Sequence, residues 1–443
     1  MQAVSATGHE TARMAQDQMQ EQKTIFTIYV STLTRHPKTT PSDSNGTPCH
    51  TPAATLTKRQ LMKHCSHCGN PLPDDAQYCG RCGQRQPARK PVGEAFIDHL
   101  NDYVGNDKPA DLNWRMLFTD VFKSHSVEEA EDIFICGTHK TTPHITQVSK
   151  EWPRPWLYSR VFVMFTVAFV LLWLCCNMFR NPNTLPGMIV VGSFAVPLST
   201  MILFLEVNAW RNVSLYKVIQ TFLVGGCASL VATLLLFSIV GSHKLDFFGA
   251  ALTGFVEETG KAVIVYHFLK RTTGRLSILS GLLIGASVGA GFAAFESAGY
   301  AMSPVLAFFQ NSGYYAAYGR QLDISVMLDA INQSIVLRGF LAPGGHVTWA
   351  AISGAGMVIA AKALRRLDTS VLTDARFLRL FAIPVVLHAT WDSPLTAIGQ
   401  DILLVPLALT AIVWIVVLIL INMGLAEVEQ AERAYFRRHA QLT

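Results

Sequence analysis

Charged side chains are scarce in this chain: Asp, Glu, Lys and Arg together make up 15% of its 443 residues. Ordinary soluble domains carry about 25% charged residues. Hydrophobic residues account for 50% of the sequence, and the mean hydropathy is +0.29. The length alone would allow two or three soluble domains, but this composition predicts a membrane protein instead.

The chain also lacks the cysteine pattern of a secreted domain. Four of its nine cysteines form two Cys-x-x-Cys pairs, and Cys175 and Cys176 are adjacent in an apolar run, so no disulfide framework is predicted. The first apolar run, Ile25–Val30, is too short for a secretory signal peptide. The net charge of +5 comes from bases next to apolar runs rather than from one patch, so no nucleic-acid partner is expected.

Shifts in composition divide the chain into segments. The first is rich in Thr, Ser, Pro and Gln and has no helical or strand period, which is typical of disorder, and Met62 after it is an alternative start. The predicted organisation is a disordered leader (1–61), a zinc ribbon (62–84), a cytoplasmic linker or small helical segment (85–150), a transmembrane domain (151–424) and a cytoplasmic tail (425–443).

Two Cys-x-x-Cys turns separated by ten residues, each followed by a glycine, favour a structural zinc site. Each turn directs two thiolates at one point, and two turns complete a tetrahedron; a redox pair is the alternative, with His64 and His67 as substitute ligands. Such a closed site stabilises a fold and could contact a cytoplasmic protein partner, but it does not catalyse. The predicted zinc ligands are Cys65, Cys68, Cys79 and Cys82.

Apolar runs long enough to cross a bilayer fill the second half of the chain, since a spanning helix needs about 20 residues. We therefore predict an all-α multi-pass membrane protein with about eight transmembrane helices and a small N-terminal zinc ribbon. The predicted spans are Leu157–Phe179, Leu185–Val207, Leu215–Val240, Phe247–Leu269, Leu276–Met302, Ile335–Ala361, Phe377–Ile398 and Ile402–Met423.

Basic residues are concentrated in alternate loops of this arrangement. The loop after Leu269 and the loop around Arg365 and Arg366 are basic, as is the C-terminal end, whereas the intervening loops carry few bases. The positive-inside rule then places both termini in the cytoplasm, with the domain in the plasma (inner) membrane of the cell. A reducing compartment also suits zinc-binding thiolates.

Glu257, Glu258 and Lys261 lie near the middle of one predicted span. A charge at that depth costs at least ~2.5–3.5 kcal/mol. On a helix the lysine is four residues from the first carboxyl and three from the second, so it can pair with either. A buried ion pair that fixes helix packing would explain one glutamate and the lysine. The second glutamate favours proton chemistry, because one of two carboxyls beside one amine has a displaced pKa.

Three further spans carry intramembrane polar residues. Glu296 lies on a span with a stripe of small residues at four-residue intervals, namely Gly281, Gly285, Gly289, Ala293 and Ser297. His346 follows Pro343-Gly344-Gly345, which should break or kink its helix. His388 and Asp392 are four residues apart, so the carboxylate can orient the ring. The set includes a general base and potential metal ligands, as hydrolysis by an activated water requires.

The motifs Glu257-Glu258-x-x-Lys261, Phe292-x-x-x-Glu296, His346 and His388-x-x-x-Asp392 resemble the four motifs of the PrsW family of intramembrane proteases. That family is related to the CAAX prenyl endopeptidases. The resemblance covers roughly residues 245–395 and implies cleavage of a membrane-anchored protein, in some members an anti-sigma factor. In the third motif only the histidine is carried over.

On this resemblance Glu257 or Glu258 is the general base and Lys261 keeps the pair charged. Asp392 orients one histidine. The residues that would bind a divalent catalytic metal or stabilise the oxyanion are Glu296, His346 and His388; whether a metal is needed stays open. Two other functions stay open as well. A proton-coupled transporter could use the same groups as a relay, although no internal repeat supports it, and a non-catalytic scaffold would tolerate loss of the carboxyls.

Overall fold

The structure is a computed structural model, and it divides into two compact units, 1–96 and 97–443, which are described separately. The predicted leader, 1–61, lies outside the described residues. The structure describes residues 62–65, 67–73, 76–85, 92–109, 111–179, 181–241, 244–272, 274–317, 324–399 and 402–440.

The first unit contains a two-stranded antiparallel sheet, β1 (Met62–His64) paired with β2 (Pro71–Pro73). Gly69 and Gly83, which follow the two Cys-x-x-Cys pairs, have φ angles of +71° and +69°. Only glycine adopts this left-handed conformation without a steric penalty. Each glycine N–H donates to the carbonyl of the first cysteine of its pair, at 2.9 and 2.8 Å, so the two turns are closed in the same way.

A connecting segment of short helices follows: α2 (Val92–Val104), η1 (Trp114–Phe118), α3 (Val127–Phe134) and η2 (Ile145–Gln147). Of these, η1 is a single 3₁₀ helix of five residues. Ser126 and Glu129 form a capping box that starts α3. The buried Leu117 belongs to the main hydrophobic core, so the segment packs against the helices that follow.

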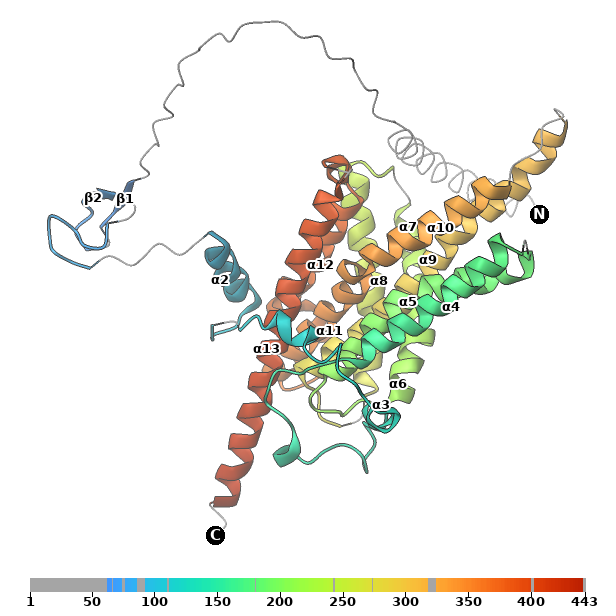
Figure 1. Ribbon diagram of the computed structural model, residues 1–443. Coiled ribbons are helices and arrows are strands. Elements are labelled where there is room, and N and C mark those ends of the chain that lie inside the picture. Colours follow the sequence, from blue (N-terminus) through green and yellow to red (C-terminus); the bar gives the residue numbers. More distant parts are fainter. Residues whose placement is uncertain are drawn as a thin grey trace, which may run out of the picture. The chain divides into compact units, whose positions relative to one another are not determined.

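Long apolar helices make up the remainder of the second unit (Figure 1). They are α4 (Leu157–Asn177), α5 (Leu185–Val207), α6 (Leu215–Gln220) continued by the π-turn η4 (Thr221–Gly225) into α7 (Gly226–Val240), α8 (Phe247–Lys270), α9 (Ile278–Ala317), α10 (Ile324–Leu341), η5 (Ala342–Gly344), α11 (His346–Leu364), α12 (Ala375–Asp392) and α13 (Leu404–Ala440). Short 3₁₀ turns, η3 (Pro182–Thr184), η6 (Thr369–Thr373) and η7 (Pro394–Ala397), lie between them.

Within the described residues, six helical segments are long and apolar enough to cross a membrane. Helices α8 and α12 lie on two further predicted spans but carry the charged residues discussed below, which lower their hydropathy. The six candidate spans are Leu157–Asn177, Pro182–Val207, Leu215–Val240, Ile278–Gln310, Ile324–Leu364 and Leu404–Ala440. The chain is an all-α multi-pass membrane protein, and all eight predicted spans fall on helices.

The boundaries of four spans differ by several residues from those predicted. One of them is α9, which continues to Ala317, beyond the predicted end at Met302. The span predicted as Ile335–Ala361 begins at Ile324 and is not continuous, because η5 separates α10 from α11. The break expected at Pro343-Gly344-Gly345 is thus confirmed. The next span ends at Asp392 rather than Ile398, since Pro394 starts a separate 3₁₀ turn.

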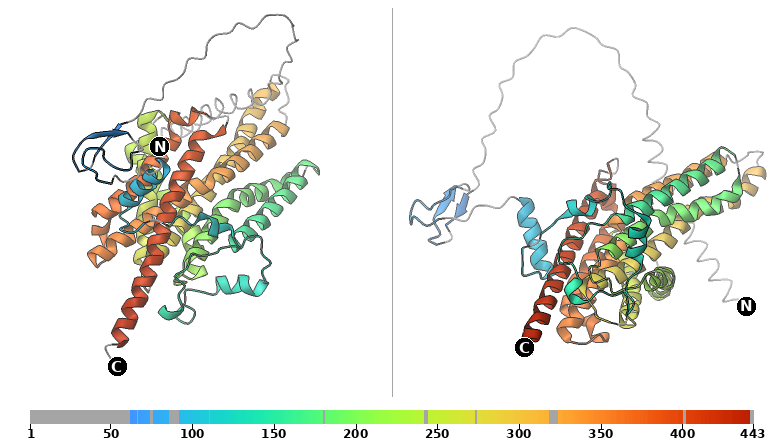
Figure 2. Two further views of the ribbon diagram at one scale, coloured as in Figure 1. Left: turned by 60° about the vertical axis from the view of Figure 1, so that its left-hand side comes forward. Right: turned by 60° about the horizontal axis from the view of Figure 1, so that its bottom comes forward.

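The last helix continues far beyond its predicted end at Met423, through most of the segment interpreted as a tail. Its C-terminal end extends beyond the other helices (Figure 2). Glu427 accepts a hydrogen bond from Ile278 N at the start of α9 (3.0 Å) and pairs with Lys362. No glycine or proline follows Gly424, so the helix has no local stop signal.

Helix α9 lies at the centre of the bundle and packs against α11 along much of its length, and also against α5 and α10. The predicted stripe of small residues allows α9 and α11 to approach closely, because these positions have no room for a side chain. A Cβ at Gly285 would lie 2.1 Å from the carbonyl oxygen of Ala350, and a Cβ at Gly289 would lie 2.2 Å from the carbonyl oxygen of His346. Helix α8 packs against α12 and α7, and α11 also contacts α12. Four helices, α8, α9, α11 and α12, are thereby brought together around one point.

Candidate functional site

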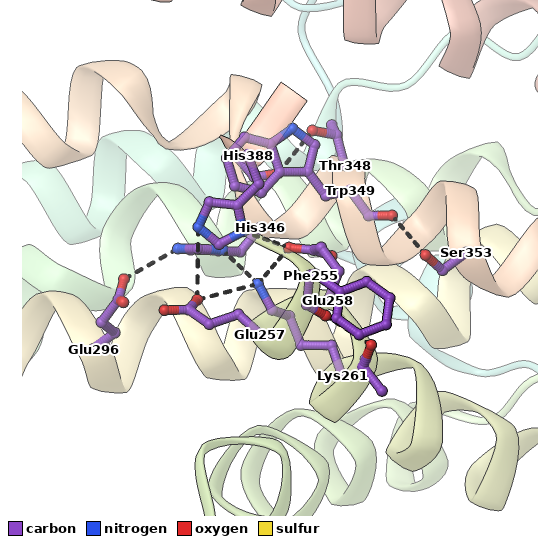
Figure 3. Close-up of polar contacts among 12 residues, drawn as sticks. Phe255, Glu257, Glu258, Lys261, Glu296, His346, Thr348, Trp349, Ser353 and His388 are labelled. Carbon is purple, nitrogen blue, oxygen red and sulfur yellow. Dashed lines mark hydrogen bonds and ion pairs between the residues drawn. The ribbon is translucent and has the colours of Figure 1, made fainter. Parts of the chain in front are cut away.

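All seven polar residues predicted for the site meet where α8, α9, α11 and α12 converge. Figure 3 shows the side chains of Glu257, Glu258, Glu296, His346 and His388 directed toward one another and toward Lys261. Each is linked to at least one other member by a hydrogen bond or ion pair. Residues separated by up to 135 positions in the chain therefore form one connected polar cluster within the apolar bundle.

Glu258 is fully buried, with 0% of its side chain exposed. Its Oε1 accepts a hydrogen bond from Lys261 Nζ at 2.6 Å and another from His388 Nδ1 at 2.9 Å. Lys261 is as buried as Glu258, and its Nζ also lies 4.3 Å from the ring centre of Phe292. The buried ammonium group is thus matched by a carboxylate and by the face of an aromatic ring.

His346 uses both ring nitrogens. Its Nδ1 accepts from Lys261 Nζ at 2.7 Å, because an ammonium group can only donate, and its Nε2–H then donates to Glu296 Oε2 at 3.1 Å. The histidine directly follows the break at η5, so the first turn of α11 presents it to the other helices. The lysine on α8 and the glutamate on α9 fix the orientation of its ring.

Arg338, on α10, was not predicted as part of the site. Its Nη2 donates to Glu296 Oε2 at 2.5 Å, its Nε donates to Ser297 Oγ at 2.9 Å, and its Cζ lies 4.2 Å from the ring centre of Tyr300. The arginine falls inside the span predicted for 335–361. An arginine at membrane depth is itself a signal of function, and that signal could have identified it.

Glu257 and Asp392 lie at the less buried side of the cluster. The side chain of Glu257 is 12% exposed, and its Oε2 lies 3.6 Å from Lys261 Nζ and 3.7 Å from His388 Nε2, with no hydrogen-bond partner. Asp392 Oδ2 lies 3.3 Å from the same His388 Nε2. From the sequence we predicted that Asp392 orients the His388 ring. In the structure Glu258 also contacts this ring, at the opposite nitrogen Nδ1, and its distance of 2.9 Å is shorter than the 3.3 Å between Asp392 and Nε2.

The two hydroxyl groups that follow His346 on α11, those of Thr348 and Ser353, do not join the cluster. The Thr348 hydroxyl donates to the carbonyl of Gly345 at 2.9 Å, and the Ser353 hydroxyl donates to that of Trp349 at 3.3 Å. Trp349 instead provides an aromatic wall, with its ring stacked on His388 at 4.5 Å between centres. Figure 3 shows Ser353 apart from the carboxylates. The histidine is therefore the part of the third motif that reaches the site.

The charges in the cluster do not balance. Four carboxyl groups, with only Lys261 and Arg338 as cationic partners in the contacts described, leave an excess of two negative charges when both rings are neutral. His388 faces carboxylates at both nitrogens, but a neutral imidazole donates from only one. With Nδ1–H directed to Glu258, the Nε2 lone pair faces the oxygens of Glu257 and Asp392, and a cation between them would relieve the repulsion.

Glu257, His346 and His388 meet the geometric requirement for such a cation, since they offer ligand atoms that all lie within 4.8 Å of one another. Two histidines and one carboxylate form a ligand set found in catalytic zinc sites. A metal-binding histidine commonly donates its other N–H to a carboxylate, and Glu258 holds that position on His388. The residues present therefore fit a divalent metal, and His346 would exchange its contact with Lys261 or with Glu296 for the ion.

The four cysteines of the first unit form a separate cluster. Their sulfur atoms lie within 4.8 Å of one another, with Cys65 Sγ and Cys68 Sγ 3.6 Å from Cys82 Sγ and Cys79 Sγ, respectively. Tetrahedral coordination with Zn–S bonds of ~2.3 Å places sulfur atoms ~3.8 Å apart. Burial opposes ionisation of the Cys65 thiol, but the N–H groups of Cys68 and His67 outweigh it and lower its pKa to about 6.

Comparison with known proteins identifies both parts of the chain. A zinc-ribbon domain family model matches residues 64–85, which contain the four cysteines. The family model described as PrsW family intramembrane metalloprotease matches residues 213–421. This range contains helices α6 to α12 and every member of the polar cluster. No curated protein and no solved structure matches the chain. Behind its zinc ribbon, the chain contains a region, residues 213–421, that matches the PrsW family of intramembrane proteases.

Proposed function

We propose that this protease hydrolyses a peptide bond of a membrane-anchored protein, with Glu257 as the general base. The site lies among membrane-spanning helices, so its substrate must enter the membrane or lie at its surface. The observation that carries the proposal is the position of Glu257, whose carboxylate lies with both histidines in one group of possible ligands and whose side chain is 12% exposed, whereas that of Glu258 is 0% exposed.

The choice between the two adjacent glutamates follows from their surroundings. Glu258 has no exposed surface, and its Oε1 is already engaged by Lys261 and His388. Glu257 makes no hydrogen bond through Oε2 and keeps 12% of its side chain exposed, so water would reach it more readily than Glu258. Glu257 would accept a proton from the attacking water and return it to the leaving amine, so that water and a peptide bond become a carboxylate and an amine.

Glu258 and Lys261 act as positioning residues in this mechanism. Glu258 holds His388 through Nδ1 and leaves Nε2 facing the reaction centre, while Lys261 joins Glu258 to His346. Arg338 and His346 both contact Glu296 Oε2, so the arginine holds the carboxylate in the position from which it fixes the second histidine. The proposed role of Asp392 is to raise the negative potential at His388 Nε2.

Glu257, His346 and His388 would hold a divalent metal, with Glu296 and Asp392 as neighbouring carboxylates. When bound, such a metal supplies Lewis-acid polarisation of the peptide carbonyl and lowers the pKa of water. The excess negative charge of the cluster supports this part of the proposal. With one carboxylate oxygen of Glu257 holding the metal, the other oxygen would remain available for proton transfer.

We further propose the plasma (inner) membrane as the location, with both termini and the zinc ribbon in the cytoplasm and the ribbon available to a protein partner. The even number of predicted spans and the basic loops support this sidedness. A reporter fused after Arg366 should lie in the cytoplasm, and one inserted between α9 and α10 should lie on the opposite side. The reverse pattern would contradict the assignment.

The test compares membrane peptides by mass spectrometry in cells that express the wild type, Glu257→Gln, Glu258→Gln or Thr259→Val. Thr259 is a half-buried neighbour on the same helix whose hydroxyl donates to the carbonyl of Phe255, and it serves as the matched control. Glu257→Gln should fold normally and lose cleavage by ~10²-fold or more, as expected for removal of a general base. Thr259→Val should cleave like the wild type.

Glu258→Gln should lose activity together with stability, because removing one partner of a buried ion pair costs about 3–5 kcal/mol. Thermal unfolding of the purified variants separates the two effects. Continued cleavage by folded Glu257→Gln would contradict its role as base. If the wild type generated no new membrane peptides relative to Glu257→Gln, the proposed substrate class would be wrong.

A further inference from the structure

Three large aromatic side chains are exposed in a short part of the connecting segment, far from the polar cluster in sequence. Trp114, Phe118 and Phe122 are 56%, 53% and 92% exposed, respectively. Single exposed apolar residues are common on protein surfaces, but large rings clustered within nine residues mark an interaction site. Arg115, next to the tryptophan, lies with its Cζ 5.6 Å from that ring centre.

This segment is fixed to the first turn of the first membrane span. The Tyr158 hydroxyl donates to the carbonyl of Leu117 at 3.0 Å, and Arg160 Nη2 donates to the carbonyl of Lys123 at 2.9 Å. His125 stacks on Trp156, directly before α4, with ring centres 3.8 Å apart. The exposed rings therefore have a defined position along the axis of α4.

That position corresponds to the membrane surface. The run of exposed apolar side chains on α4 begins at Phe162 and continues with Val163 and Met164. Tyr158 and Arg160 lie four and two residues before this run, so both are within about one helical turn of it, ~5.4 Å along the axis. The start of α4 is also held firmly, because the Glu206 carboxylate accepts hydrogen bonds from three successive backbone N–H groups there, those of 156, 157 and 158.

We propose that residues 114–123 form an interfacial anchor that inserts Trp114, Phe118 and Phe122 into the headgroup region of the lipid bilayer beside α4. Aromatic side chains are enriched at this depth because they have both polar and apolar parts. Arg115 and Arg160 add positive charge that complements anionic lipid headgroups, whereas Lys123 is paired with Asp120 at 2.6 Å. The lipid-facing surface of α4 continues directly into the anchor, which favours lipid over a protein as the partner.

Photo-cross-linking tests the anchor in the full-length protein in native membranes. The photoreactive residue p-benzoylphenylalanine replaces one phenylalanine at a time, and intact mass spectrometry identifies adducts. Phe122 is the test position. Phe162, exposed on the apolar part of α4, is the positive control, and Phe436, exposed near the C-terminal end of α13, is the negative control.

Irradiation should add the mass of one phospholipid to the protein labelled at 122, as it does at 162, and add none at 436. An unmodified mass at 122 together with lipid adducts at 162 would overturn the proposal. Cross-links from 122 to another protein in place of lipid would also overturn it and would identify the segment as a protein-docking surface. Because a phenylalanine derivative replaces phenylalanine at an exposed position, folding is retained, and adducts at 162 verify correct insertion.

Discussion

At the scale of single residues, adjacent glutamates on one helix have different surroundings. Glu257 and Glu258 differ by about 100° around the axis of α8. One faces the less buried side of the cluster, and the other is enclosed between Lys261 and His388. The two side chains are chemically identical, so their proposed roles, Glu257 as base and Glu258 as positioning residue, follow from their locations alone.

Arg338 leads to a prediction at this scale. Arg338→Met removes the charge beside Glu296, and Arg338→Lys keeps the charge but loses the contact from Nε to Ser297. Both variants should lower kcat by ~10–100-fold, as measured for residues that orient metal ligands, with KM and the unfolding temperature little changed. Arg379→Met, at an exposed position on α12, is the control. Wild-type kcat in folded Arg338→Met would exclude the arginine from the mechanism.

At the scale of elements, the approach of α9 to α11 decides whether Glu296 reaches His346. A Cβ at Gly289 would lie 2.2 Å from the carbonyl oxygen of His346, so a larger residue must push the two helices apart. The displaced backbone belongs to the histidine itself. A change that adds one methyl group therefore alters the geometry of the site directly.

Gly289→Ala should destabilise the protein by about 1–3 kcal/mol, as overpacking does, and should lower activity more than this loss of stability explains. Gly299→Ala is the matched control on the same helix, because a Cβ there meets no other atom within 4 Å. Thermal unfolding and cleavage assays on both variants provide the comparison. Equal activity in the two folded variants would show that close packing at Gly289 does not position the site.

At the scale of the whole molecule, the zinc ribbon and the helical domain are separate compact units. Cys65→Ser combined with Cys68→Ser should release one equivalent of zinc and unfold only the ribbon, because a small four-cysteine site depends on its metal. Metal analysis measures the loss, and thermal unfolding of the helices should be unchanged. Cys227→Ser, at an exposed cysteine on α7, should retain all the zinc. Unfolding of the helical domain on zinc loss would contradict the independence of the two units.

Much of the fold could be predicted from the sequence, because its signals are local. Apolar runs of about 20 residues identify spanning helices, and Cys-x-x-Cys followed by glycine identifies a zinc-binding turn. The break before His346 follows from Pro343 and two glycines in the same way. The continuation of α13 to Ala440 was missed, because the prediction ended the helix where its apolar run ended.

The polar residues of the site were also recognisable from the sequence alone, since charge within an apolar span is costly wherever the span lies. Their partners were decided by the tertiary structure. Local spacing allowed Lys261 to pair with either glutamate, whereas packing places it 2.6 Å from Glu258 and 3.6 Å from Glu257. The contacts of Arg338 with Glu296 and of His388 with Glu258 join different helices, so they depend on how those helices pack, which no spacing within one helix determines.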